Sequence, residues 1–89
     1  MLIQREASAG APESADVLVT VRPADAFDIR VTSVVQAQFG AAIMQSVREV
    51  LTQLAVSPCE VVIDDHGALD WILRARLEAA LLRAKGEPV

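Results

Sequence analysis

The stretch CEVVIDDHGALDWILRARLEAALLRA, residues 59–84, decides the fold because its apolar pattern changes period once. Cys59–Asp64 is rich in β-branched residues and is typical of a strand. Asp65-His66-Gly67 has the composition of a turn. Beyond the turn, apolar residues recur at helical spacing and form one face: Leu69, Ile72, Leu73, Leu77, Ala80, Leu81 and Ala84. The stretch therefore predicts a strand, a turn and an amphipathic helix, which Gly86 and Pro88 end.

The chain before residue 59 shows the same two periods. Alternation of Val17, Val19 and Val21 with other residues predicts a strand from Asp16 onward. The alternation breaks at Pro23 and resumes over residues 28–32, so we expect these two strands to pair as an antiparallel hairpin. Helical spacing then returns in a second apolar stripe, which consists of Phe39, Ile43, Val47, Val50, Leu51 and Leu54.

The predicted fold class is α+β, a two-layer sandwich with the element order ββαβα. Two helices are expected to pack on one face of a small mixed sheet, because each has a single apolar face. The third strand can lie beside the first or the second. If it lies parallel to the second strand, a right-handed crossover through the first helix is expected. Residues 1–15 are expected to form a flexible N-terminal arm with at most a short edge strand, and residues 16–86 a single α+β domain.

Composition limits the classes of function. The chain of 89 residues is 53% apolar and 22% charged, which describes one globular domain with a modest core. A net charge of −4 argues against unaided binding to nucleic acid. No apolar run is long enough to cross a bilayer, so no membrane partner is expected. The single cysteine suits a reducing compartment, and the expected location is cytoplasmic.

Few side chains could carry chemistry of their own. His66 stands between acidic residues, but no other His or Cys is at metal-ligand spacing, so a turn residue is favoured. Cys59 is expected to be a small core residue. Asp64 and Asp65 are adjacent in a strand and should point to opposite faces, which weakens an acid/base pair. Trp71, Phe27 and Phe39 are expected in or near the core. No catalytic residue and no metal site is therefore predicted.

Two features stand above this background. Arg76 and Arg83 are seven residues apart and share a face of the last helix. A solvated face is the favoured interpretation, and a docking surface for an acidic partner or a phosphate group is the alternative. Ser14 lies in a loop of small residues just before the alternating run. A turn role is the ordinary interpretation, and a covalent modification site is the alternative.

The chain resembles the acyl carrier (gamma) subunits of bacterial citrate lyase. Three stretches carry the resemblance: AGAPESADVLV at residues 9–19, QFGAAIMQSVREVLTQLAV at 38–56 and VVIDDHGALDWILRARLEAALLRA at 61–84. The third is the most specific, because its acidic turn, Gly-Ala-Leu and Leu-Arg-Ala-Arg stand in the family's order. At position 15, alanine stands where the resemblance leads us to expect glycine or serine.

The resemblance implies that Ser14 holds a covalent cofactor, 2'-(5''-phosphoribosyl)-3'-dephospho-CoA, through a phosphodiester. It implies a non-catalytic carrier of the acetyl or citryl thioester during cleavage of citrate to acetate and oxaloacetate. The implied partners are the alpha (acyl transferase) and beta (acyl lyase) subunits of citrate lyase and a prosthetic-group transferase. Arg76 and Arg83 are the candidate partner-binding residues.

Other functions stay open at this point. The chain could serve a citramalate lyase or a malonate decarboxylase complex as its acyl carrier. It could be a protein-interaction module that binds a partner through its basic helix and carries nothing. A small metal-binding or redox protein that uses Cys59 and His66 is the weakest alternative.

Overall fold

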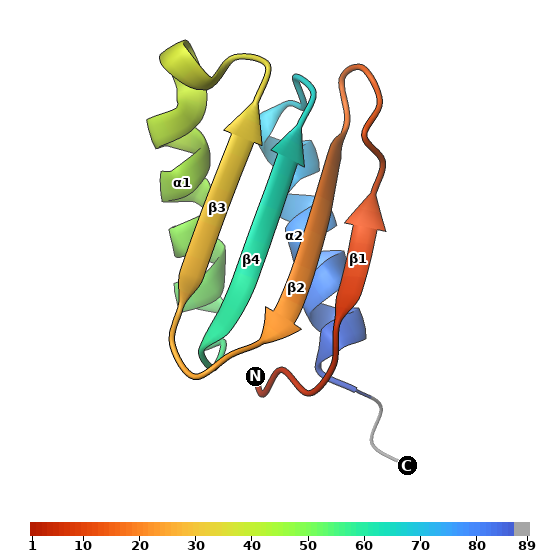
Figure 1. The fold of residues 1–89 in the computed structure, drawn as a ribbon, viewed down its shortest axis with the longest axis vertical. Helices are drawn as coiled ribbons and strands as arrows, with labels where there is room; N and C mark the ends of the chain where they lie inside the picture. Colours follow the sequence, from red (N-terminus) through yellow and green to blue (C-terminus); the bar gives the residue numbers. More distant parts are fainter. Residues whose placement is uncertain (87–89) are drawn as a thin grey trace.

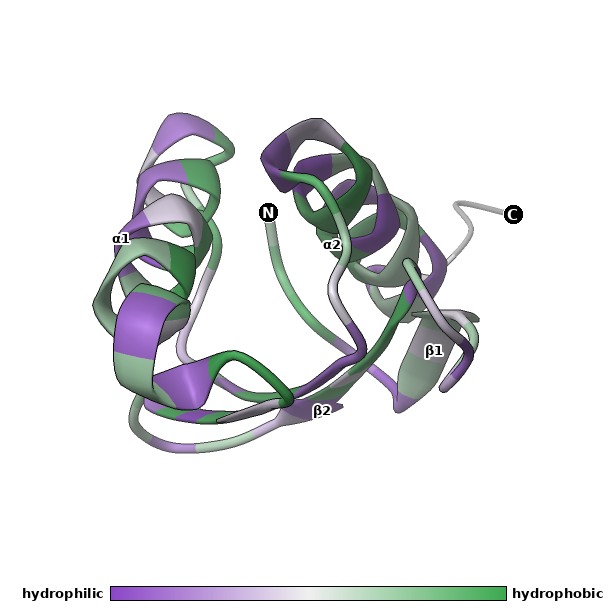
Figure 2. Cartoon of the chain, turned by 90° about the horizontal axis from the view of Figure 1, so that it is seen from above, coloured by the Kyte–Doolittle hydropathy of each residue, from purple (hydrophilic) through white to green (hydrophobic). Residues whose placement is uncertain are grey.

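The computed structural model describes residues 1–86, and Pro88 lies outside them. Four strands form one mixed sheet, and both helices lie on the same face of it (Figures 1 and 2). The elements in chain order are β1 (Ala7–Gly10), β2 (Val17–Pro23), β3 (Asp28–Ser33), α1 (Gln36–Gln53), β4 (Cys59–Asp65) and α2 (Asp70–Ala84). The predicted two-layer α+β sandwich is confirmed.

The strand order is β1-β2-β4-β3, so β4 lies between the two strands expected to form a hairpin. It pairs antiparallel with β2 and parallel with β3, and Ile63 is opposite both Val19 and Val31. The predicted β2–β3 hairpin is therefore wrong. Alternation determines which face a side chain occupies but not which strand is its neighbour. The strand with the strongest apolar pattern takes the centre, where both of its edges are hydrogen-bonded.

The crossover from β3 through α1 to β4 is left-handed, contrary to the expectation from the usual preference. In Figure 1 both helices lie behind the sheet, and the chain moves from β3 to β4 on its right. In this arrangement α1 packs on the outer strand β3 and on α2, while α2 packs on β1 and β2. The two helices thus divide the sheet between them, and each buries its own half.

The core lies between the sheet and the helices. Val17, Val19 and Val21 of β2 are completely buried together with Val61 and Ile63 of β4. The helical stripes cover them through fully buried residues such as Val47, Leu77 and Leu81. Burying one such side chain is worth about 1.5–3 kcal/mol, so this layer is the main source of stability.

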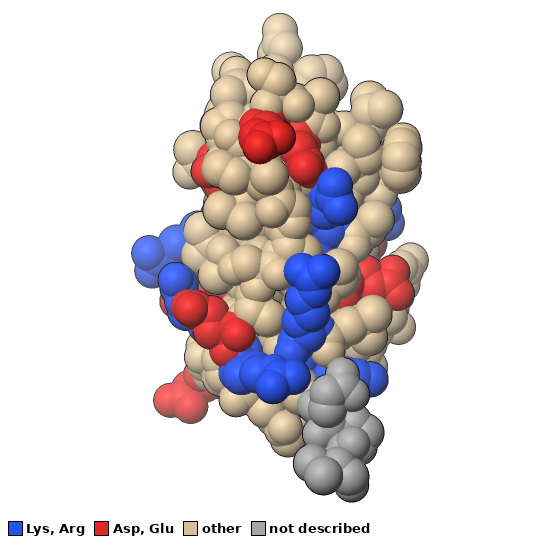
Figure 3. All heavy atoms as spheres, turned by 90° about the vertical axis from the view of Figure 1, so that its right-hand side faces the viewer, with Lys and Arg blue, Asp and Glu red and all other residues tan. Residues whose placement is uncertain are grey.

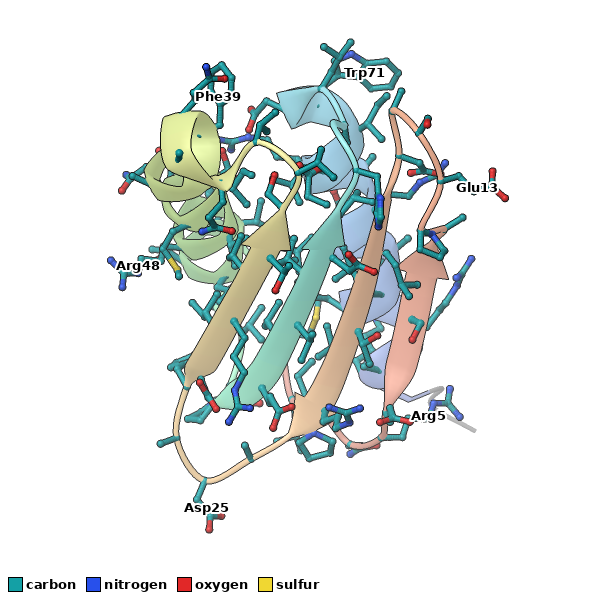
Figure 4. The ribbon with its side chains drawn as sticks, turned by 45° about the horizontal axis from the view of Figure 1, so that its top comes forward. Arg5, Glu13, Asp25, Phe39, Arg48 and Trp71 are labelled. Atoms are coloured by element: carbon teal, nitrogen blue, oxygen red, sulfur yellow. The ribbon has the colours of Figure 1, made fainter. Side chains whose placement is uncertain are left out.

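The three aromatic residues do not join this core. Phe27, Phe39 and Trp71 are all exposed, and 68% of the accessible surface of Trp71 remains open. Figure 4 shows Phe39 and Trp71 pointing outward at the same end of the molecule. The expectation that they pack in or near the core is therefore wrong. The core is filled by aliphatic side chains, which leaves large apolar surface available at this end.

The N-terminal segment is part of the fold rather than a separate arm. β1 pairs antiparallel with β2 along the edge of the sheet, and Ile3 and Ala9 are buried in the core. The N–H of Ile3 also donates to the hydroxyl of Ser57 at 3.0 Å. Residue 15 is consequently not a structural boundary, although the short edge strand expected in residues 1–15 is present.

Candidate functional site

Ser14 lies at the tip of the loop that joins β1 to β2. The loop closes with a tight turn in which the N–H of Asp16 donates to the carbonyl oxygen of Glu13 at 2.9 Å. Ala15 adopts a φ of 64°, the left-handed conformation that the third residue of a type II turn requires. This turn projects Ser14 into solvent, as Figure 4 shows for the neighbouring Glu13.

Gly10 makes the entry into this loop possible. Its φ is +86°, and a Cβ added there would lie 1.9 Å from the carbonyl oxygen of Val17. The N–H of Ala11 donates to the same oxygen at 3.1 Å, so the two ends of the loop are held close together. Only glycine fits this close approach of two backbone segments.

The backbone of His66 holds the other side of the loop. Its carbonyl oxygen accepts the N–H of Ala15 at 2.8 Å, and its N–H donates to the carbonyl oxygen of Asp16 at 3.0 Å. The His66 side chain lies beside Asp64, with Nε2 3.0 Å from Oδ1. His66 thus contributes to the Ser14 turn through its main chain, which sequence reasoning did not predict.

An ion pair joins the loop to α2. Arg76 donates through Nε and Nη2 to the two carboxylate oxygens of Asp16, at 3.2 and 3.3 Å. The N–H of Val17 also donates to Asp16 at 2.8 Å. This backbone hydrogen bond and, after it, the hydrogen bond from Arg76 lower the pKa of Asp16. The carboxylate therefore stays ionised at neutral pH and keeps Arg76 in place.

Ser14 differs from the other serines in its hydrogen bonding. Each of the other four has a partner for its hydroxyl: Thr20 for Ser8, Asp65 for Ser33, Asp70 for Ser46 and the N–H of Ile3 for Ser57. Within residues 1–86 the hydroxyl of Ser14 has none, and the residue is exposed. Among these residues, Ser14 is therefore the serine whose hydroxyl is both exposed and free of an intramolecular hydrogen bond.

The predicted partner-binding arginines both contact the N-terminal segment. Arg76 binds Asp16, and Nη1 of Arg83 donates to the carbonyl oxygen of Ser8 at 2.8 Å. Nε of Arg5 in turn donates to the carbonyl oxygen of Arg83 at 2.9 Å. Figure 3 shows basic side chains gathered along the side of the molecule where β1 and α2 lie. Both arginines remain exposed, so this side combines a structural role with an open cationic surface.

Asp65 is a buried carboxylate whose role the sequence did not indicate. It is 3% exposed and accepts hydrogen bonds from the Ser33 hydroxyl at 2.7 Å and the Ala68 N–H at 3.1 Å. The carboxylate therefore connects the end of β3 to the turn before α2. Asp64 is on the opposite face beside His66, so the two acids do not form a pair.

The remaining candidates for chemistry are inaccessible or dispersed. Cys59 is completely buried, and burial raises the pKa of its thiol. Among residues 1–86, no three His, Cys, Asp or Glu side chains are placed to hold a metal ion. No helix in the same part of the chain is long and apolar enough to span a membrane. Ser14 and the cationic side beside it remain the candidate features among the described residues.

Comparison with known proteins identifies a family and several similar chains. A family model described as malonate decarboxylase delta subunit matches residues 4–84. The citrate lyase acyl carrier protein of Serratia proteamaculans is 51% identical, over 94% of this chain and 84% of that protein. The protein of the same name from Haemophilus ducreyi is 49% identical, over 98% and 92% of the two chains. In the crystal structure of a Pseudomonas malonate decarboxylase hetero-tetramer in complex with malonate, one chain aligns with a TM-score of 0.73 and 25% identity, over 91% of this chain and 84% of that one.

Proposed function

Because the chain belongs to the citrate lyase acyl carrier protein family, we propose that it is an acyl carrier subunit loaded at Ser14. The observation that supports Ser14 most directly is its hydrogen bonding: it is the serine whose hydroxyl has no partner within residues 1–86. An exposed oxygen at a turn can be approached by an enzyme without unfolding the domain. The structure fits a covalently attached group, since nothing has to move away from this oxygen.

The proposed group is 2'-(5''-phosphoribosyl)-3'-dephospho-CoA, attached through a phosphodiester. When bound, it supplies the accessible thiol for acetyl and citryl thioesters that the buried Cys59 cannot provide. Ser14 anchors it, Gly10 and Ala15 shape the turn, and the Asp16–Arg76 pair fixes the turn against α2. The chain itself is proposed to be non-catalytic, and its residues position the attachment point.

The proposed reaction is the cleavage of citrate to acetate and oxaloacetate by a multi-subunit complex. The partners would be the alpha acyl transferase, the beta acyl lyase and a prosthetic-group transferase, and a tethered thioester reaches both enzymes at high effective concentration. The cationic side with Arg76 and Arg83 is the proposed docking surface. We place the complex in the cytoplasm, where a free thiol stays reduced.

A malonate decarboxylase carrier is the second candidate, because the family model bears that description. Sequence identity favours citrate lyase, at 51% against 25% for the chain of the Pseudomonas complex. Reconstitution with each set of partner subunits separates the two. Turnover of citrate supports the first proposal, and decarboxylation of malonate without citrate cleavage supports the second. A citramalate lyase complex is distinguished in the same assay by its substrate.

Peptide mapping tests the attachment site. The chain is produced together with the prosthetic-group transferase and the enzymes that make its substrate, and its intact mass is measured. We expect one adduct with the mass of the nucleotide group, on the peptide that contains Ser14. An adduct on Ser8, Ser33, Ser46 or Ser57 with Ser14 unmodified contradicts the assignment. Unmodified protein under conditions that load a homologous carrier supports a plain interaction module instead.

A further inference from the structure

A groove with a volume of about 260 Å³ lies between the Ser14 turn and the first turns of α2. Its lining consists of Ala15, Asp16, Trp71, Ile72, Ala75 and Arg76. We call it the Trp71 groove. One wall begins at the residue that follows Ser14, and the other carries the only tryptophan of the chain.

The exposure of Trp71 is unusual for a tryptophan and suits a stacking site. A tryptophan normally buries most of its large apolar surface, yet 68% of Trp71 is open. Its neighbours in the groove include Ala15 and Ala75, whose small side chains leave space for a flat ring beside the indole. Exposed aromatic side chains next to a cation are a common platform for nucleobases, which stack on them irrespective of sequence.

We propose that the Trp71 groove is a resting cradle for the nucleotide part of the group held by Ser14, with Trp71 stacked on the adenine. This inference rests on the proposed function and assigns a second role to this chain's own surface. A phosphate and a ribose separate Ser14 from the adenosine, so the base can turn back to a groove whose edge is Ala15. The pantetheine end and its thiol then extend from the groove toward the partner enzymes.

Arg76 supplies the matching charge. Its Nε and Nη2 donate to Asp16, and within residues 1–86 its Nη1 has no hydrogen-bond partner. The Asp16 contact orients the guanidinium, and the unpaired Nη1 can donate a hydrogen bond to a phosphate oxygen. The Asp16 carboxylate is already neutralised by this pairing, so it opposes a phosphate less than a free carboxylate would.

The larger apolar groove at the same end of the molecule fits a nucleotide less well. It lies between the start of α1 and the start of α2, and its lining includes Phe39, Leu69, Asp65 and Asp70. Its only charged side chains are acidic, so it would repel phosphates. The Trp71 groove combines an aromatic ring, a cation and direct continuity with the attachment residue, and we therefore assign the nucleotide to it.

The single tryptophan makes the proposal directly measurable. Emission of Trp71 is compared between unloaded protein and protein whose complete loading at Ser14 has been confirmed by mass. Stacking on adenine should lower the emission of the loaded protein and protect Trp71 from acrylamide quenching. The H2 and H8 proton resonances of the adenine should also shift upfield relative to free dephospho-CoA.

Two variants separate stacking from a general effect of loading. In loaded Trp71→Leu the adenine resonances should return to the positions seen in free dephospho-CoA. In loaded Leu69→Ala they should remain shifted, because Leu69 is also exposed, at 62% against 68% for Trp71, but lies outside the Trp71 groove. Fully loaded wild-type protein with unchanged emission and unshifted adenine resonances overturns the cradle and leaves the carrier role intact. Absence of any adduct at Ser14 overturns both the nucleotide site in the Trp71 groove and the proposed loading at Ser14.

Discussion

Nε of Arg76 on α2 lies 3.2 Å from Oδ1 of Asp16, two residues after Ser14, so one ion pair connects the loop with the proposed attachment residue to the helix layer. The pair is separated by sixty positions in sequence. It orients the turn without enclosing it, since both side chains remain partly exposed. The ion pair therefore fixes the orientation of the Ser14 turn and leaves Ser14 accessible to solvent.

Asp16→Asn should loosen the Ser14 turn at neutral pH. Exposed ion pairs add little to global stability, so the melting temperature should change only slightly, while amide exchange at Ala15 and Asp16 becomes faster. Arg76→Gln should give the same local result. Unchanged exchange in both variants would show that the backbone bonds to His66 alone hold the turn.

The same pair predicts a pH dependence. The pKa of Asp16 is lowered in the folded state, so the contribution of the pair is complete above the ordinary aspartate pKa of about 3.9 and is lost as the pH falls through the lower, folded value. Amide exchange in the turn, corrected for its intrinsic pH dependence, should therefore accelerate below about pH 4. In Asp16→Asn this acid-dependent change should disappear.

Gly10→Ala should destabilise the domain by at least about 3 kcal/mol, because it combines a left-handed φ with a collision. A Cβ there would meet the Val17 carbonyl oxygen at 1.9 Å. Gly67 is the matched control, since its φ is +91° but a Cβ would have no neighbour within 4 Å. Gly67→Ala should cost only about 1–2 kcal/mol. Equal losses in urea unfolding would mean that the close approach at Gly10 does not matter.

Ala15→Gly should stabilise the protein by up to about 1 kcal/mol. The φ of 64° is unfavourable for alanine, and glycine removes that strain at a smaller entropic cost. Ala11→Gly in the same loop is the control: φ at Ala11 is not in the left-handed region, so this change should cost roughly 0.5 kcal/mol. A loss of stability in Ala15→Gly comparable to that in the control would contradict the strain at this turn.

The turn geometry gives a physical reason for the residue that the resemblance leads us to expect at position 15. Glycine or serine was expected there, and the positive φ of Ala15 shows why glycine suits the position. The expectation at position 15 came from the resemblance, whereas β2 and α2 were predicted from the alternation after Asp16 and the helical spacing of residues 69–84. The i,i+4 spacing of Asp70 and Arg74 likewise allows an ion pair, which the structure has at 2.7 Å.

What the sequence did not reveal depends on partners distant along the chain. Nothing in the alternation of β2 and β3 shows that β4 will enter between them. The burial of Asp65 follows from Ser33 and Ala68, which meet it only after the sheet has formed. Trp71 was expected in or near the core, but its ring is exposed, and composition alone does not show which large apolar side chain stays at the surface.

Arg83→Glu should weaken assembly with the transferase and lyase subunits. The change removes a cation from the proposed docking side and breaks the hydrogen bond to the Ser8 carbonyl oxygen, and the remaining association should depend less on salt. Arg48→Glu is the control, because Arg48 is an exposed cation on α1, away from this side (Figure 4). Equal affinities of the two variants in sedimentation or binding assays would return Arg83 to a structural role.

Ser14→Ala should fold with a free energy of unfolding within about 0.5 kcal/mol of wild type, because its hydroxyl has no partner to lose within residues 1–86. It should nevertheless acquire no prosthetic group and support no citrate cleavage with the other subunits. Ser8→Ala is the informative control, since Ser8 is exposed but its hydroxyl is paired with Thr20 at 3.1 Å. That variant should load and turn over normally. Citrate cleavage by folded, unloaded Ser14→Ala would require another carrier for the thioester, and loss of loading in Ser8→Ala alone would move the attachment site to β1.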